Sequence, residues 1–277
     1  MSACYNSPVA SKPVPADRSP APVLDLPARF AWVGEQIGCV LPGGRALFTT
    51  RRGGVSAAPY DTLNLGLLTA DDPAAVSANR DRLAALTGIA RERTLQGMQV
   101  HGTVVRRVAQ LSGEPQEMVE ADGQATALGG VAAIVLTADC LPIALIAEEA
   151  VAIVHAGWRG LAGGVVAEGV RALRELGARE VHAAIGPGAG ACCYETGPEV
   201  HAAFASYGPD ARRGDNADLK LVARRQLQRA GAREIADVGI CTLCAPRGLL
   251  FSHRRDGATT GRQAGVVWRD SGRTWPS

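Results

Sequence analysis

A cysteine and a histidine lie fifteen positions apart in one mostly apolar stretch, LTADCLPIALIAEEAVAIVHAGWRG, at residues 136–160. They are Cys140 and His155. A thiolate and an imidazole can bind zinc together, and they can also form a nucleophilic dyad. Both residue types also occur in protein cores, where a free thiol packs as a small apolar group. The stretch by itself leaves these three interpretations open.

The predicted strands around Cys140 and His155 indicate how the two side chains could come close together. Residues 141–147 and 150–156 are apolar runs with the length of buried strands. If they form an antiparallel hairpin, His155 lies opposite Pro142. Side chains alternate between faces along a strand, so Cys140 is then the diagonal neighbour of His155 on the same face. A slip of one residue in register would separate them onto opposite faces.

A third ligand is needed for a metal site, and His101 is the best candidate among the remaining histidines. It lies in QVHGTVVRRV, residues 99–108, which we interpret as a strand. Gly102 beside it would let a substrate or a neighbouring backbone approach closely. Two histidines and one cysteine, with a fourth position open, form the pattern of a catalytic zinc site.

The composition is that of an ordinary globular chain of 277 residues, and it excludes several classes of partner. The formal net charge is only +2, from 29 basic and 27 acidic residues, and no basic stripe indicates a nucleic-acid surface. No apolar run approaches the ~20 residues of a membrane span, and the N-terminus lacks the order of a secretory signal. Seven cysteines, an odd number, suit a reducing compartment. We therefore expect a cytoplasmic protein with no nucleic-acid or membrane partner.

Short β-like runs alternate with helical runs, which favours a mixed α/β fold. The first 25 residues are rich in Pro, Ser and Ala, so we expect a disordered tail at 1–25 and a single domain at 26–277. Strands are expected within residues 46–56, 99–108, 130–138, 141–147, 150–156 and 180–188, and helices within residues 71–89, 160–178 and 219–232.

Several motifs occur in order along the chain: QVHG, ADG at 121–123, TADCLP, HAGWRG, IGPG with CCYE, and FSHRRDGATTGRQAG. Together they resemble the YfiH, or laccase-domain, family of purine nucleoside phosphorylases, over about residues 45–268. The resemblance implies zinc ligands at His101, Cys140 and His155, with copper as the alternative metal. It also implies mixed sheets sandwiched between helices, similar to the catalytic domain of a bacterial cytotoxic necrotizing factor.

The resemblance implies an activity as well: phosphorolysis of adenosine, inosine, guanosine and S-methyl-5′-thioadenosine, and deamination of adenosine to inosine. The expected partners are purine nucleosides and phosphate, and a monomer is expected. Arg52 and Arg159 lie within family motifs beside glycine turns, so we assign them to phosphate. Asp122 and Asp139 are candidates for proton transfer to the purine, although an aspartate beside a turn more often bonds backbone.

Three other functions are considered. A copper polyphenol oxidase is disfavoured because a multicopper cluster takes many imidazoles and the chain has five histidines. A cysteine hydrolase would use Cys140 as the nucleophile and His155 as its base, and the family's link to peptidoglycan editing supports that alternative. A binding protein without catalysis is the third.

The chain departs from the family pattern at two positions, and it also contains two pairs of closely spaced cysteines. Tyrosine is frequent in the family where this chain has His253, and asparagine where it has Ala223. Cys241 and Cys244 form CTLC, but one CxxC lacks the second pair of a zinc ribbon. We therefore predict a structural or incidental role for them, and likewise for the adjacent cysteines at 192 and 193.

Overall fold

The computed structural model describes residues 24–111 and 118–270. The predicted tail at 1–25 falls almost wholly outside the described residues, so the boundary between tail and domain stays a prediction. None of the helices in the described ranges has both the length and the apolar character that crossing a membrane requires.

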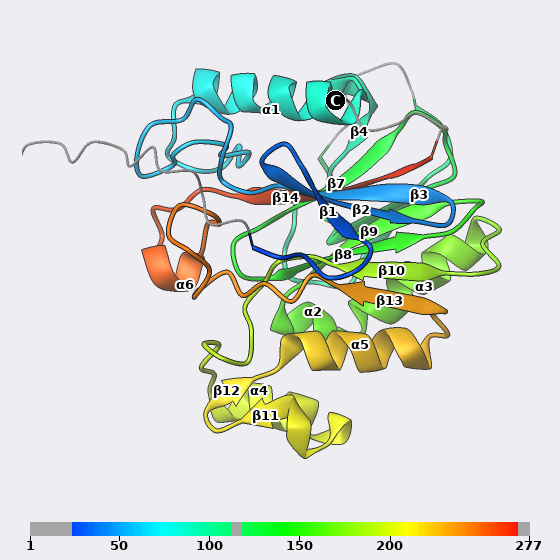
Figure 1. The fold of residues 1–277 in the computed structure, drawn as a ribbon. Coiled ribbons are helices and arrows are strands. Elements are labelled where there is room, and N and C mark those ends of the chain that lie inside the picture. The colour runs from blue at the N-terminus through cyan, green and yellow to red at the C-terminus, as the bar shows by residue number, and fades with distance from the viewer. Residues whose placement is uncertain (1–23, 112–117, 271–277) are drawn as a thin grey trace, which may run out of the picture.

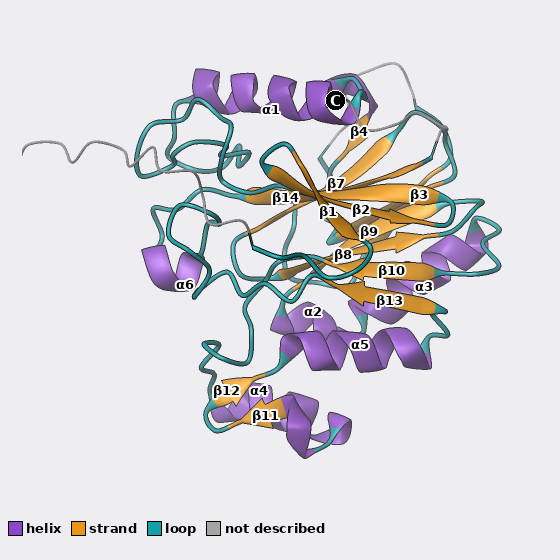
Figure 2. Ribbon diagram, viewed as in Figure 1, coloured by secondary structure: helices purple, strands orange, loops and turns teal. Residues whose placement is uncertain are grey.

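Two six-stranded mixed sheets lie face to face, and helices cover their outer sides (Figures 1 and 2). This confirms the predicted class. The first sheet has the order β1 (Phe30–Val33), β2 (Gln36–Leu41), β3 (Gly44–Phe48), β14 (Gln263–Arg269), β7 (Ala132–Thr137) and β4 (Thr94–Leu95). The second has the order β13 (Glu234–Asp237), β10 (His182–Ile185), β8 (Leu141–Ile146), β9 (Val151–Ala156), β6 (Gly123–Thr126) and β5 (Val105–Val108).

The helices form the outer layers, with α1 over the first sheet and α2, α3 and α5 over the second (Figure 1). A short hairpin of β11 (Arg212–Arg213) and β12 (Asn216–Ala217) lies beside α4. The helices are α1 (Pro73–Thr87), α2 (Trp158–Gly163), α3 (Val165–Glu175), α4 (Pro198–Phe204), α5 (Leu219–Arg229) and α6 (His253–Asp256), with 3-10 turns η1 (Arg91–Arg93), η2 (Ala205–Tyr207) and η3 (Pro209–Ala211).

The strands at the centre of the second sheet are apolar on both faces because both faces are covered. Along β8, Ile143 and Leu145 pack toward the helices of the second sheet, while Ala144 and Ile146 pack toward the first sheet. All four side chains are fully buried. This double burial explains why these strands read as continuous apolar runs and not as alternating ones.

The helix expected within 71–89 forms as α1, and local signals set its ends. The Asp72 carboxylate accepts a hydrogen bond from the Ala74 N–H at 2.9 Å, and Pro73 occupies the first turn. Gly88 ends the helix with φ of 68°. The single helix expected within 160–178 is corrected: Gly164, with φ of 91°, separates α2 from α3.

The predicted hairpin register is confirmed, and the predicted strand at 99–108 is corrected. Pro142 pairs with His155 in β8 and β9, as the sequence argument required. His101, however, lies in a loop, and β5 begins only at Val105. The His101 backbone has φ of 60°, and its N–H bonds the Asp122 carboxylate, so this segment cannot continue a strand ladder.

Candidate metal centre and pocket

Three elements of the second sheet bring the predicted ligands together. Cys140 directly precedes β8, His155 lies near the end of β9, and His101 lies in the loop before β5. Cys140 Sγ is 3.8 Å from His101 Nε2, and the ligand atoms of all three residues lie within 4.8 Å of one another. The two imidazole rings meet edge to face, with centroids 4.8 Å apart. The structure therefore forms the cluster that the register argument predicted.

The Asp122 carboxylate positions both histidines of the cluster through hydrogen bonds. Its fully buried carboxylate accepts a hydrogen bond from His155 Nδ1 at 2.8 Å, which leaves Nε2 of that ring for the cluster. It also accepts the backbone N–H groups of His101 at 2.9 Å and Gly102 at 2.7 Å. A carboxylate behind a ligating histidine fixes the tautomer and the ring orientation. Proton transfer and backbone bonding were weighed for Asp122 from the sequence, but not the hydrogen bond to His155, which the ADG motif could have indicated.

The electrostatics of the cluster favour a charged cysteine and a charged histidine in the absence of a cation. Burial by itself would raise the pKa of the Cys140 thiol, but the charge of His155 and hydrogen bonds from both histidines lower it to about 6. Burial would lower the pKa of His155, but the Cys140 thiolate and the Asp122 carboxylate raise it to about 9. Burial also opposes ionisation of Asp122, yet the His155 and backbone N–H donors lower its pKa.

Asp139, the second predicted acid–base candidate, is held as a structural anchor. Its Oδ1 accepts from Thr242 Oγ1 at 2.6 Å, and its Oδ2 accepts from the Arg254 N–H at 2.7 Å. Its own backbone has φ of 98°, directly before Cys140. A non-glycine residue in this region costs free energy and persists only where its surroundings hold it. The hydrogen bonds of Asp139 therefore fix the position from which Cys140 enters the cluster.

A cavity of about 530 Å³ opens over the cluster, and its volume is within the range of small-molecule sites. Arg159, Arg254 and Arg262 line it, together with His253. Arg52 is not among the lining residues, because its guanidinium donates to the Gly248 carbonyl at 2.9 Å. The apolar part of the wall is formed by Leu67, Leu68, Met98 and Trp158.

The arginines of the pocket differ in how they are held. The Arg159 guanidinium stacks over the Trp158 ring at 4.4 Å, and that of Arg254 stacks over Tyr194 at 4.8 Å. Arg262 is more buried, and its burial lowers the pKa of its guanidinium. The predicted Arg159 lies in this pocket, and Arg262, which lies in the motif GRQAG, was not predicted from the sequence.

Residues 45–270 match the family model described as multi-copper polyphenol oxidoreductase laccase. A relative in Shigella flexneri named purine nucleoside phosphorylase YfiH is 39% identical over 238 residues, covering 82% of this chain and 95% of the relative. The chain belongs to this laccase-like YfiH family. The resemblance predicted from the motifs is thereby confirmed.

Further members of the family support the assignment. A Xylella fastidiosa protein named purine nucleoside phosphorylase is 42% identical over 246 residues, covering 82% of this chain and 93% of that protein. The crystal structure of YlmD from Geobacillus stearothermophilus superposes with a TM-score of 0.80 at 34% identity, covering 88% of this chain and all of that one (100%). The mixed fold with two sheets is therefore the fold of the family.

The cluster has the donor chemistry of a metal site in this laccase-like family. Ligands at ~2.3 Å for sulfur and ~2.0 Å for nitrogen lie about 3.5 Å apart around one tetrahedral ion. The 3.8 Å between Cys140 Sγ and His101 Nε2 is close to that separation. Gly157 keeps the space clear, because a Cβ there would lie 3.0 Å from both Cys140 Sγ and His101 Cδ2. The three residues therefore fit a metal ion, and their donor set alone does not select its identity.

The fold supplies the second cysteine pair that the CTLC motif lacks in the sequence, while the predicted structural or incidental role stays a prediction. Cys241 and Cys244 were expected to lack a second pair, yet Cys192 and Cys193 lie directly beside them. The sulfur atoms of all four lie within 4.8 Å of one another. The pairs are separated by about fifty residues of sequence, so only the tertiary structure shows that they form one group.

Proposed function

We propose that this chain is a zinc-dependent purine nucleoside phosphorylase that also deaminates adenosine. The observation that carries the proposal is the histidine–cysteine–histidine cluster at the base of a pocket lined by three arginines. The names of the relatives point to the same class of substrate. Adenosine, inosine, guanosine and S-methyl-5′-thioadenosine are the proposed nucleosides, with phosphate as co-substrate.

Zinc is the proposed metal because two imidazoles and one thiolate suit it, with His101, Cys140 and His155 as ligands. A zinc ion with three protein ligands is a Lewis acid and lowers the pKa of a water in its open position toward ~7. Copper is the alternative metal. A multicopper cluster is not supported, because only two of the five histidines join the group.

The chain's own residues position the substrates for phosphorolysis. In that reaction an oxygen of phosphate bonds to C1′ of the ribose, and the bond from C1′ to the purine nitrogen breaks. Arg159, with Arg254 and Arg262 nearby, provides guanidinium groups suited to phosphate oxygens. The apolar side of the pocket, including Trp158 and Met98, suits the face of a purine.

Deamination uses water in place of phosphate and replaces the amino group at C6 of adenosine with oxygen, releasing ammonia. Both reactions need the nucleoside in the same pocket, so they should differ in their need for phosphate. Without phosphate, adenine release should stop while inosine formation continues. Adenosine is incubated with metal-replete protein, with and without phosphate, and adenine, inosine and ribose 1-phosphate are quantified by mass spectrometry. The Cys140→Ala variant is the blank, and no turnover above it with any purine nucleoside would refute the proposal.

The phosphate assignment has its own test. Loss of the Arg159 guanidinium should cost ~2–4 kcal/mol in transition-state binding, or about 30- to 1000-fold in the phosphorolysis rate. Steady-state kinetics at varied phosphate compare Arg159→Ala with Arg179→Ala, an exposed arginine paired with Glu149 at the opposite end of the β8–β9 hairpin. Arg52→Ala is measured in the same series, which tests the sequence-based assignment of that residue. Normal phosphate dependence in Arg159→Ala would show that this residue does not bind phosphate.

A cysteine hydrolase is the second candidate, and one observation favours it. Cys140, His155 and Asp122 follow the order of nucleophile, base and orienting carboxylate, and the pKa of Cys140 is lowered to about 6. Such an enzyme would cleave an amide bond, for example in a peptidoglycan stem peptide. Hydrolysis of stem peptides by metal-free protein, without turnover of nucleosides, would favour this candidate over the phosphorylase.

A further inference from the structure

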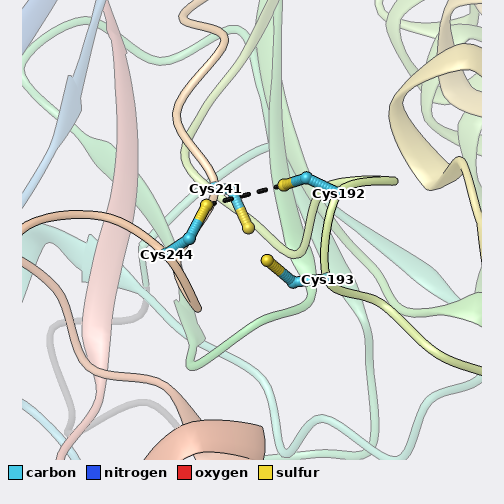
Figure 3. Close-up of side chains that lie close together, drawn as sticks. All are labelled: Cys192, Cys193, Cys241 and Cys244. Atoms are coloured by element: carbon cyan, nitrogen blue, oxygen red, sulfur yellow. Dashed lines mark hydrogen bonds between the residues drawn. The ribbon is translucent and has the colours of Figure 1, made fainter.

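Four cysteine side chains form a second cluster, outside the pocket described above (Figure 3). Cys192 Sγ and Cys244 Sγ are 3.5 Å apart, and the sulfurs of Cys193 and Cys241 complete a group within 4.8 Å. A disulfide bond requires ~2.05 Å between sulfurs. Two thiolates bound at ~2.3 Å to one tetrahedral ion lie about 3.8 Å apart. The Cys192–Cys244 separation is close to that value, and the group as a whole is compact enough for four ligands around one ion.

The topology of the second sheet creates this group. Strands β10 and β13 are parallel neighbours, so the loops that follow them leave the sheet at the same end. The loop after β10 carries Cys192 and Cys193, and the loop after β13 carries Cys241 and Cys244. Backbone hydrogen bonds join the two loops, since the Thr242 N–H donates to the Gly188 carbonyl at 3.1 Å. The two pairs are thus held opposite each other by the fold.

Gly190 allows the backbone to approach the sulfurs. Its N–H donates to Cys241 Sγ at 3.3 Å, and a Cβ at this position would lie 3.2 Å from Cys192 Sγ. Hydrogen bonds from the protein to a ligating atom orient it and tune its basicity. An amide directed at a sulfur, with no side chain in between, is the environment that a bound thiolate needs.

The donor set identifies the kind of site. Cys241 is buried, whereas Cys192 and Cys244 are exposed, so packing in an apolar core does not account for the group. Four sulfurs with no histidine or carboxylate among them leave no open coordination position. Closed tetrahedral sites of four cysteines are structural zinc sites, and CxxC spacing is frequent in them.

We propose that Cys192, Cys193, Cys241 and Cys244 bind one structural zinc ion, separate from the catalytic centre. The ion fastens two loops that shape the active-site pocket. Tyr194, directly after Cys193, lines that pocket. Thr242, between the other two cysteines, donates to Asp139 beside Cys140. The structural site therefore positions the catalytic one.

Metal analysis of the Cys140→Ala variant tests the proposal independently of the proposed function, because this variant disables the other cluster. The variant should retain one zinc per chain, and X-ray absorption should show only sulfur ligands, at ~2.3 Å. Cys192→Ser together with Cys244→Ser in the same background should reduce the zinc content at least tenfold. Unchanged zinc content in that combination, nitrogen or oxygen ligands, or iron in place of zinc would each overturn the proposal.

Controls separate loss of the ion from loss of the fold. Cys192 and Cys244 are exposed, so serine there removes no buried side chain, and circular dichroism checks that the variant is folded. Cys39→Ala is the matched control: it removes a buried thiol in the core between the sheets and should leave the zinc content unchanged. An equal loss of zinc in Cys39→Ala would contradict assignment of the ion to the four cysteines.

Alkylation with iodoacetamide, followed by peptide mass spectrometry, gives a second measurement on the full chain. Cys192 and Cys244 should resist alkylation in the zinc-replete protein despite their exposure, and they should react at least tenfold faster after treatment with a chelator. Rapid alkylation without chelator would contradict the proposal. Resistance that only a reducing agent removes would show a disulfide in place of the ion.

Discussion

Asp122 is the residue on which the geometry of the His101–Cys140–His155 cluster most depends. Its carboxylate accepts hydrogen bonds from the His155 imidazole and from the backbone of the loop that carries His101. Two ligands from separate elements are thus oriented by one buried charge. The cost of burying that charge is offset only while all its donors remain in place.

We predict that Asp122→Asn weakens both metal binding and stability. The substitution keeps the size of the side chain, but its NH₂ group cannot accept the hydrogen bonds that the carboxylate accepts. The free energy of unfolding should fall by ~1–3 kcal/mol and metal affinity by about 10- to 100-fold. Urea unfolding and metal titration measure the two effects. Asp81→Asn, at an exposed carboxylate, should change neither.

The ionisation of the Cys140 thiol gives a second prediction at the scale of single residues. In metal-stripped protein, alkylation of the Cys140 peptide should follow a thiolate with a pKa of about 6, fast above that pH and slow below it. His155→Gln removes the positive charge that lowers the pKa and leaves the burial that raises it, so the midpoint should move upward. Alkylation rates are measured from about pH 4 to about pH 10, so that the range covers both the protonated thiol and the thiolate. An identical midpoint in the variant would show that His155 does not set the pKa.

Among the elements, the junction of β9 and α2 leaves the space that the cluster side chains occupy. Gly157 stands at this junction, and its backbone is extended, so alanine fits its conformation without strain. The obstacle is the added methyl group, which would press on both Cys140 Sγ and His101 Cδ2. The glycine is needed for space and not for flexibility.

We therefore predict that Gly157→Ala lowers metal affinity and kcat/KM by about tenfold or more, because the ligands must shift by a few tenths of an ångström. The free energy of unfolding should change little. Metal titration and nucleoside kinetics are compared with urea unfolding of the same samples. Gly129→Ala is the control, since a Cβ there has open space around it. Full metal affinity in Gly157→Ala would show that the ligands adapt to the methyl group.

For the molecule as a whole, the two sheets share one apolar core. Phe48 of the first sheet is fully buried in the core between the sheets. It packs so closely on Gly186, the residue after β10 of the second sheet, that a Cβ at Gly186 would lie 2.3 Å from the ring. The Phe48 side chain thus packs against the end of β10, the strand beside β8 in the second sheet.

Phe48→Ala should lower the free energy of unfolding by ~3–5 kcal/mol, through lost burial and the cavity that remains. Because the core joins both sheets, unfolding should remain a single transition at a lower urea concentration. Fluorescence and circular dichroism monitor it, with Val40→Ala, at a half-exposed position, as the control. Two separated transitions in the variant would show that the sheets unfold independently.

The sequence by itself determined the parts of this protein that depend on local pattern. A hairpin between the apolar runs 141–147 and 150–156 predicted the register that joins Cys140 to His155, and Pro142 does lie opposite His155. The apolar runs also predicted a sheet that is covered on both faces. The helix expected within residues 71–89 begins after Asp72 and ends before Gly88. These features need only neighbours in the chain, so period and spacing suffice to predict them.

Only the tertiary structure decided which distant segments meet. It placed Arg262 in the pocket and Arg52 outside it, and it directed Asp122 at His155. It also paired β10 with β13, which brought two cysteine pairs about fifty residues apart into one group. The order of strands in a sheet depends on the packing of the whole chain, and no local period encodes it. For that physical reason a lone CxxC and a lone CC could be recognised as one cluster only in the folded protein.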